Sequence, residues 1–130
     1  MLEATSICDG FVDIDLERLE TLSSEETDML PYGVVALDQE GLVVAYNRTE
    51  ARLAGLPAAS VIGSHFFLSI AQCMNNFMVA QRFEDEKELD TVINYMLTFR
   101  MRPTPVRLRL LQGAAASRRW ILVDRSMVGG

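Results

Sequence analysis

Residues 30–51, LPYGVVALDQEGLVVAYNRTEA, decide the fold of this chain. Two short apolar runs rich in β-branched residues, 34–37 and 42–46, flank the polar stretch DQEG. Such runs favour strands, and Gly41 can adopt the positive φ that a tight turn requires. The stretch therefore predicts a β-hairpin.

The hairpin runs directly into a helix start. Asn47 stands where an N-cap is expected, and Glu50 follows three residues later, which is the spacing of a capping box. The helix is expected to end at Gly55, because Pro57 prevents its continuation.

The rest of the chain completes a sheet. Residues 75–88 carry apolar side chains at helical spacing and predict a longer amphipathic helix. Three apolar or alternating segments then predict strands: DTVINYMLTFRM (90–101), VRLRLLQG (106–113) and RRWILVDRS (118–126). The expected fold class is α+β, with a central five-stranded antiparallel sheet and helices on one face.

The N-terminal segment differs in charge from the rest. Residues 1–29 are acidic, have apolar residues at helical spacing and predict an N-terminal helical cap on a core of residues 30–126. Residues 100–125 are rich in arginine. The acidic segment could lie against a basic edge or face of the sheet, or the two could form separately solvated surfaces.

Composition excludes several classes of function. The chain has 130 residues, 49% hydrophobic and 23% charged, which indicates one globular domain. Its net charge of -6 argues against nonspecific nucleic-acid binding, and no apolar run is long enough to span a membrane. Two cysteines distant in sequence and a start without secretory features predict a cytoplasmic protein.

Few residues could carry chemistry. His65 is the one histidine, so a zinc site is not expected, while a haem held by His65 stays open. Cys73, in SIAQC, could be a core residue, a nucleophile, a metal ligand or an attachment point. Tyr46 and Glu50 can face one interior, where a phenol and a carboxylic acid could both donate hydrogen bonds to an anionic oxygen. Alternatively, Glu50 only caps the helix and Tyr46 fills the core.

A more specific signal comes from six segments of the sequence: LPYGVVALDQEG, YNRTEA, VIGSHFF, IAQC, MRPTPVRL and RRWILVDR. Together they resemble the photoactive yellow protein family, whose members are blue-light receptors with the PAS fold. The resemblance implies p-coumaric acid bound through a thioester to Cys73, with Tyr46 and Glu50 hydrogen-bonded to its phenolate. It also implies that light isomerises the chromophore, that Glu50 gives up a proton, and that the buried carboxylate releases the N-terminal cap. Met101 matches a methionine that helps the thermal return.

The chain departs from the family pattern around that site. Ala54 replaces a threonine that supports the tyrosine, Leu56 an arginine that shields the pocket, Gln72 a proline before the cysteine, and Leu97 an aromatic residue. These residues predict a shifted absorption maximum, a higher pKa of the phenolate and altered recovery.

Three functions follow for testing. The first is a non-enzymatic photoreceptor that signals to a downstream protein not identified by the sequence. The second is a PAS sensory or protein-interaction module with another ligand or none. The third is a thiol enzyme or redox sensor using Cys73, which the lack of a neighbouring base disfavours. A homodimer formed through the sheet or the N-terminal segment stays open.

Overall fold

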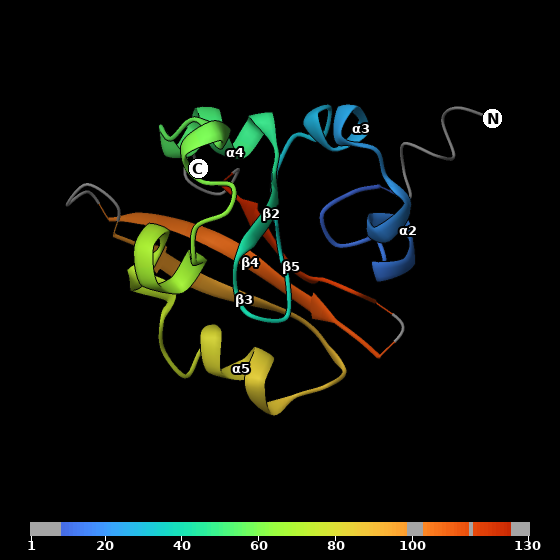
Figure 1. Cartoon of the computed structure of the whole chain (residues 1–130), viewed down its shortest axis with the longest axis vertical. Coiled ribbons are helices and arrows are strands. Elements are labelled where there is room, and N and C mark those ends of the chain that lie inside the picture. Colours follow the sequence, from blue (N-terminus) through green and yellow to red (C-terminus); the bar gives the residue numbers. More distant parts are fainter. Residues whose placement is uncertain (1–8, 99–102, 115, 126–130) are drawn as a thin grey trace.

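A computed structural model of the chain describes residues 9–98, 103–114 and 116–125, arranged around one antiparallel sheet (Figure 1). The strands are β1 (Gly33–Leu37), β2 (Val43–Tyr46), β3 (Leu89–Leu97), β4 (Thr104–Gln112) and β5 (Arg119–Asp124). Their order in the sheet is β2-β1-β5-β4-β3, and every neighbouring pair is antiparallel. The predicted α+β class with a central five-stranded antiparallel sheet is confirmed.

Strands β1 and β2 form the predicted hairpin. Val35 lies opposite Tyr46. In the turn, Asp38 accepts two hydrogen bonds of 2.9 Å from backbone N–H groups, and Gly41 has a φ of 91°. The side chain of aspartate at the head of the turn and the freedom of glycine at its end fix this geometry.

Alternation along the strands divides the apolar side chains between two faces of the sheet. One face carries a cluster that we call the helix-side core, which includes Val35, Leu37, Tyr46, Phe66, Ala71, Met74, Leu97, Leu108, Ile121 and Val123. The other carries the cap-side core: Phe11, Ile14, Leu19, Leu30, Tyr32, Val34, Ala36, Leu111, Trp120 and Leu122. Neighbouring residues of β1 and β5 therefore belong to different cores.

Short helices and turns cover the helix-side core. They are α4 (Arg48–Ala54), η1 (Ala58–Ser60), the π-helical turn η2 (Phe66–Ile70), η3 (Gln72–Met74) and α5 (Ala80–Asp85). Asn47 is the N-cap of α4, and Gly55 ends that helix with a φ of 75°, as predicted. The predicted capping box is wrong in one half, because the backbone N–H of Asn47 donates to Val34 and the carboxyl of Glu50 binds elsewhere.

The long helix predicted over 75–88 is also wrong. Helix α5 covers only Ala80–Asp85, and Phe77 is 78% exposed. The side-chain oxygen of Asn76 accepts hydrogen bonds from the N–H groups of Met78 and Val79. This local bonding gives the backbone an alternative to a helical turn before residue 80.

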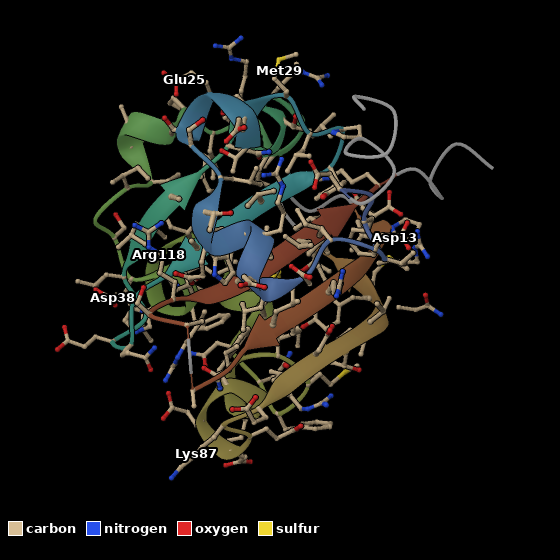
Figure 2. The ribbon with its side chains drawn as sticks, turned by 90° about the vertical axis from the view of Figure 1, so that its right-hand side faces the viewer. Asp13, Glu25, Met29, Asp38, Lys87 and Arg118 are labelled. Carbon is tan, nitrogen blue, oxygen red and sulfur yellow. The ribbon has the colours of Figure 1, made fainter. Side chains whose placement is uncertain are left out.

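Helix α2 (Leu16–Thr21) covers the opposite face of the sheet, and Figure 2 shows it lying across the strands, while α3 (Ser24–Asp28) follows it and contacts α4. Asp15 caps α2, and Ser23 forms a reciprocal capping box with Glu26 at the start of α3. The division into a cap of residues 1–29 and a core of residues 30–126 stays a prediction. No described helix has both the length and the apolarity to span a membrane.

The cap lies on the face of β4 that carries arginines. Arg109 donates to the backbone carbonyl of Phe11 at 2.9 Å, and Arg107 lies over the Phe11 ring at 4.9 Å. The ion pairs of these arginines are nevertheless formed within the core: Arg107–Asp124, Arg109–Asp90, Arg119–Glu84 and Arg125–Glu50. The acidic and arginine-rich segments thus meet through a backbone carbonyl, a ring and the hydrogen bonds that Glu20 accepts from Ser117 and Trp120, while these arginines pair with acids outside the cap.

Candidate functional site

Tyr46 and Glu50 lie close together at the junction of β2 and α4. Tyr46 ends β2 and belongs to the helix-side core. Glu50 lies in the first turn of α4 and is 3% exposed. Its carboxyl packs against Gly33 of β1, where an added Cβ would lie 2.0 Å from Oε1. Gly33 is two residues from Val35 and shares its face, so both side chains lie on the helix side of the sheet.

The carboxyl of Glu50 is bound by an arginine from the far end of the chain. Arg125 donates from Nη1 to Oε1 at 2.6 Å and from Nη2 to Oε2 at 3.0 Å. Glu50 is buried and Arg125 is partly buried, with side-chain exposed fractions of 4% and 12%. Burial raises the pKa of Glu50 above its ordinary value, while the hydrogen bonds and charge of Arg125 act in the opposite direction.

Tyr46 is a buried residue, 8% exposed. Burial raises its pKa most strongly, and the negative charge of Glu50 raises it further. Among the described residues, no partner forms a hydrogen bond with the Tyr46 hydroxyl. This hydroxyl could therefore donate to a bound acceptor.

Cys73 is half-buried on turn η3 and packs against the helix-side core. Its backbone carbonyl accepts a hydrogen bond of 2.5 Å from the hydroxyl of Tyr95 on β3 and another of 3.1 Å from Asn76. Asn76 also donates to the Tyr95 hydroxyl at 2.7 Å. Two side chains thus hold the backbone of the cysteine in place from the neighbouring strand and turn.

Of the other predicted site residues, some contact the helix-side core and some do not. Leu97 is 1% exposed within the helix-side core, and Leu56 packs against that core. Ala54 is half-buried at the end of α4 and does not belong to the cluster. Met101 lies outside the described residues.

These positions can be compared with what p-coumaric acid needs, which is a nucleophilic sulphur, an apolar wall and donors for a phenolate oxygen. Cys73, the helix-side core and the Tyr46 hydroxyl fit that set. Glu50 fits only when its carboxyl is protonated, because a carboxylate has no proton to donate. The residues fit the chromophore, with Glu50 also able to bind Arg125.

The structure gives little support to the alternative sites, which are a haem site at His65 and a thiol enzyme site at Cys73. His65 Nδ1 accepts a hydrogen bond from Leu68 N–H at 3.3 Å, which in a neutral imidazole leaves the proton on Nε2 and no lone pair there for a haem iron. Among the described residues, no hydrogen bond joins His65 to Cys73, and no group of three or more potential metal ligands occurs.

The first turn of α4 also holds the end of the cap. Asn47 donates to the backbone carbonyls of Thr27 at 2.8 Å and Tyr32 at 3.1 Å. Thr49 donates to the carbonyl of Leu30 at 2.6 Å. Glu50 therefore follows directly after the residues that tie α4 to the segment leaving α3.

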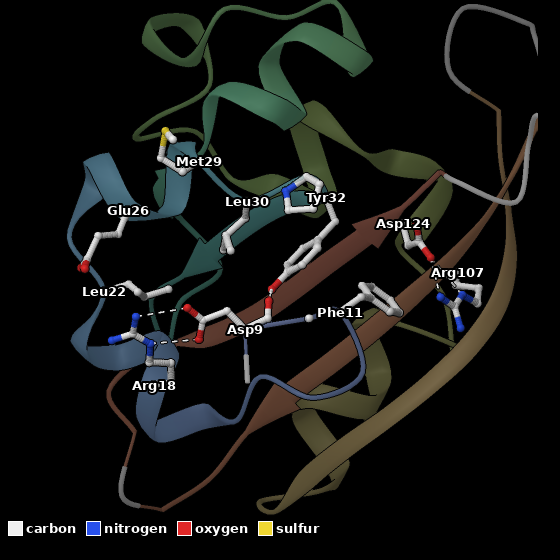
Figure 3. Close-up of a pocket in the computed structure, with 12 residues that line it drawn as sticks. Asp9, Phe11, Arg18, Leu22, Glu26, Met29, Leu30, Tyr32, Arg107 and Asp124 are labelled. Carbon is white, nitrogen blue, oxygen red and sulfur yellow. Dashed lines mark hydrogen bonds and ion pairs between the residues drawn. The ribbon is translucent and has the colours of Figure 1, made fainter. Parts of the chain in front are cut away.

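A cleft of about 700 Å³ separates part of the cap from the sheet (Figure 3). Its lining includes Phe11, Arg18, Leu22, Tyr32 and Arg107. The hydroxyl of Tyr32 crosses it to donate to the carbonyl of Asp9 at 2.6 Å. Along this side the cap is attached by this hydrogen bond and by the Phe11 ring, which packs edge-on against Tyr32.

Sequence reasoning missed Arg125, Gly33 and the pair Asn76–Tyr95. One signal for Arg125 was available: residues 121 and 123 face the helix-side core, so residue 125 continues that face. The partners of Cys73 carried no such signal, because their contacts depend on how the loop meets β3.

Comparisons with known proteins agree with the resemblance. No family model matches the chain. The photoactive yellow protein of Rhodothalassium salexigens is 30% identical over 115 residues, covering 85% of this chain and 92% of that protein. That of Cereibacter sphaeroides is 26% identical over 121 residues, covering 88% of this chain and 95% of that protein.

Solved structures point the same way. The photoactive yellow protein domain of the sensor histidine kinase Ppr from Rhodospirillum centenum is 35% identical, with a TM-score of 0.73 over 79% of this chain and 93% of that one. A PAS domain of an HTR-like protein from Haloarcula marismortui matches with a TM-score of 0.59 at 17% identity, covering 96% and 98% of the two chains. The predicted PAS fold is confirmed.

Proposed function

Because this chain belongs to the photoactive yellow protein family, we propose that it carries p-coumaric acid as a thioester on Cys73 and signals in response to blue light. Membership of the family makes it a photoreceptor domain of the PAS fold, a sensory protein rather than an enzyme. The chromophore, its attachment and the signalling steps are the parts that we propose.

The observation that supports the proposal is that three groups lie on the same side of the sheet. Cys73 and Tyr46 both contact the helix-side core, and Glu50 lies beside Tyr46 on the same side of the sheet. A bound p-coumaric acid supplies the absorption of blue light and a double bond that can isomerise. Cys73 Sγ would hold its acyl carbon, while Tyr46 and protonated Glu50 would donate to its phenolate oxygen.

The signalling step that we propose begins at Glu50. The carboxyl gives its proton to the phenolate oxygen and becomes charged between α4 and the sheet. Burying a charge is costly, so Glu50 must find a partner or move. Because Asn47 and Thr49 connect the same turn to the residues that follow α3, a shift of α4 would loosen the cap.

Reconstitution tests this function directly. Activated p-coumaric acid, supplied as its anhydride, is added to the full chain and the visible spectrum is recorded. A band is expected in the wild type and in Cys8→Ala, the control that keeps Cys73, and no band in Cys73→Ala. Glu50→Gln is expected to red-shift the band and to suppress the proton-coupled step. A wild type without a band, or a band that survives Cys73→Ala, would contradict the proposal.

A PAS module with another ligand, or with none, is the second candidate. The ion pair between Glu50 and Arg125 favours it, because it satisfies the carboxyl without a chromophore. The replacements at Ala54 and Leu56 favour it as well. The spectrum of the reconstituted chain separates the two candidates.

The cytoplasmic location, a downstream signalling partner and a homodimer stay predictions. If the output is a change of association, size-exclusion chromatography in the dark and under blue light is expected to give different elution volumes. Equal elution volumes under both conditions would mean that association does not change. A separate protein would then have to recognise the released cap itself.

A further inference from the structure

Arg125 and Glu50 form a buried, two-point ion pair. Each guanidinium nitrogen binds a different carboxylate oxygen, at 2.6 and 3.0 Å. Parallel N–H···O bonds of this kind are among the strongest that side chains form. Both oxygens accept in this geometry, which is the arrangement of an ionised carboxyl.

The position of Arg125 follows from the strand that precedes it. Ile121 and Val123 face the helix-side core, and residue 125 continues on that face. Asp124, between them, faces the cap and binds Arg107 instead. Gly33 lies opposite Val123, and its missing side chain leaves the space that the carboxyl of Glu50 occupies.

The carboxyl of Glu50 cannot form the ion pair and donate a hydrogen bond to a phenolate at the same time. A carboxyl that donates must hold its proton, whereas the carboxyl bound to Arg125 has lost it. A buried carboxylate without a partner is strongly disfavoured. Arg125 supplies that partner, and the charged or titratable groups facing Glu50 are Arg125 from the end of β5 and Tyr46 from β2.

We propose that Arg125 is the counter-ion that holds Glu50 once Glu50 has lost its proton. The proposal rests on the proposed function for the event that removes the proton: the O–H bond of Glu50 breaks, the proton goes to the phenolate oxygen, and the electron pair stays on the carboxylate. The charge produced by light is then paired instead of isolated. It follows that Arg125 prolongs the charged state of Glu50.

The first test needs no chromophore. The carboxyl of Glu50 is titrated by infrared spectroscopy in the full chain, with the Glu50→Gln spectrum subtracted to identify its band. In Arg125→Gln the pKa of Glu50 is expected to rise by about one unit or more relative to the wild type. Arg119→Gln is the control, because Arg119 begins β5, the strand that Arg125 follows, and binds a different acid, the exposed Glu84, at 3.0 Å. An unchanged pKa in Arg125→Gln would overturn the proposal.

The second test follows the charged state after a flash in the reconstituted chain. Arg125→Gln is expected to shorten the lifetime of the ionised Glu50 band by about tenfold or more, with Arg125→Lys in between because it keeps the charge without the two-point geometry. A lifetime equal to that of the wild type would overturn the role of Arg125 in the light-driven state.

Two controls distinguish a failure of this proposal from a failure to fold and from a failure of the proposed function. If Arg125→Gln does not fold, the double variant Glu50→Gln/Arg125→Gln removes both charges and is expected to restore folding, which by itself supports the pair. Failure of the double variant as well would count against an effect of the unpaired carboxylate. A raised pKa in a chain that gives no visible band would contradict the chromophore while supporting the pair.

Discussion

The indole N–H of Trp120 on β5 donates a hydrogen bond of 2.8 Å to the carboxylate of Glu20 on α2. Trp120 is the one tryptophan of the chain and is 2% exposed beneath the cap. Its emission therefore reports whether the cap is docked on the sheet. The same hydrogen bond joins the cap to β5, the strand that Arg125 follows, so the emission of Trp120 reports on a contact that the proposed signal must change.

Replacing Glu20 by alanine is expected to weaken docking of the cap. The change removes the acceptor of a charged hydrogen bond and leaves a buried indole N–H without it, which costs about 1–3 kcal/mol. We expect red-shifted tryptophan emission and faster proteolysis within the cap. Glu17→Ala, on the exposed side of the same helix, is the control and should leave both unchanged. Equal effects of the two variants would contradict a role of the Glu20–Trp120 hydrogen bond in docking the cap.

Replacing Asn47 by alanine is expected to be among the most damaging polar substitutions in the chain. Asn47 is 3% exposed, accepts from the N–H groups of Val34 and Glu50, and donates to the carbonyls of Thr27 and Tyr32. Its full hydrogen-bonding capacity is used, and each buried group left unpaired is costly. We expect a loss of about 3 kcal/mol in the free energy of unfolding, measured in urea.

The control for this prediction is Asn94→Ala, at an exposed position of β3. Its effect is expected to stay within about 0.5 kcal/mol. If Asn47→Ala behaves like the control, the connection between α4 and the cap does not depend on this side chain.

The hairpin and the sheet could be predicted because their signals are local. Alternation and β-branched runs specify strands, and a polar turn with glycine joins them. Residues 75–88 also matched a helical repeat in sequence. The side-chain oxygen of Asn76, however, accepts hydrogen bonds from the N–H groups of residues 78 and 79. Periodicity does not detect such a competing local bond.

The site was predictable in its residues and not in its bonds. Tyr46, Glu50 and Cys73 stand out by type and by resemblance. The capping box failed because the carboxyl of Glu50 meets a guanidinium 75 residues away in sequence. Which of several arginines reaches a given acid is set by strand order and register, and these are known only once the sheet is built.

Replacing Tyr95 by phenylalanine is expected to loosen the backbone of Cys73. The change deletes the hydroxyl that donates to the Cys73 carbonyl and accepts from Asn76. We expect faster modification of Cys73 by a thiol reagent, in a Cys8→Ala background, and a loss of about 1 kcal/mol in stability. Tyr32→Phe removes a comparable hydroxyl contact of 2.6 Å on the cap side and should not change the rate at Cys73. Equal rates in Tyr95→Phe and the parent would contradict this anchoring role.

Replacing Gly33 by alanine is expected to displace the carboxyl of Glu50. The added Cβ would lie 2.0 Å from Oε1, so the side chain must leave its present place beside Arg125. We expect a stability loss of about 1–3 kcal/mol, the range for overpacking, together with a changed infrared band of Glu50. Gly113→Ala is the control, because its Cβ would meet only the ends of the Leu16 and Glu88 side chains at 3.1 and 3.2 Å. A Glu50 band that is the same in both variants would contradict the placement.

The dependence of stability on pH is expected to carry the signature of Glu50. Burial raises its pKa in the folded chain above the ordinary value of 4.5, although Arg125 opposes the rise. Below pH 4.5 both folded and unfolded chains hold the proton, while above it the unfolded chain releases the proton first. The contribution of Glu50 is therefore largest in acid and is lost as pH rises through the folded pKa.

Urea unfolding of the wild type and of Glu50→Gln, measured over a pH series at constant salt, isolates this contribution as the difference between the two curves. The difference is expected to fall with rising pH. Glu26→Gln should give the opposite slope, because the Ser23 backbone N–H lowers the pKa of Glu26 in the folded chain. If the Glu50 difference instead rises with pH, then Arg125 outweighs burial and the pKa of Glu50 in the folded chain lies below its ordinary value, which would contradict the direction expected here.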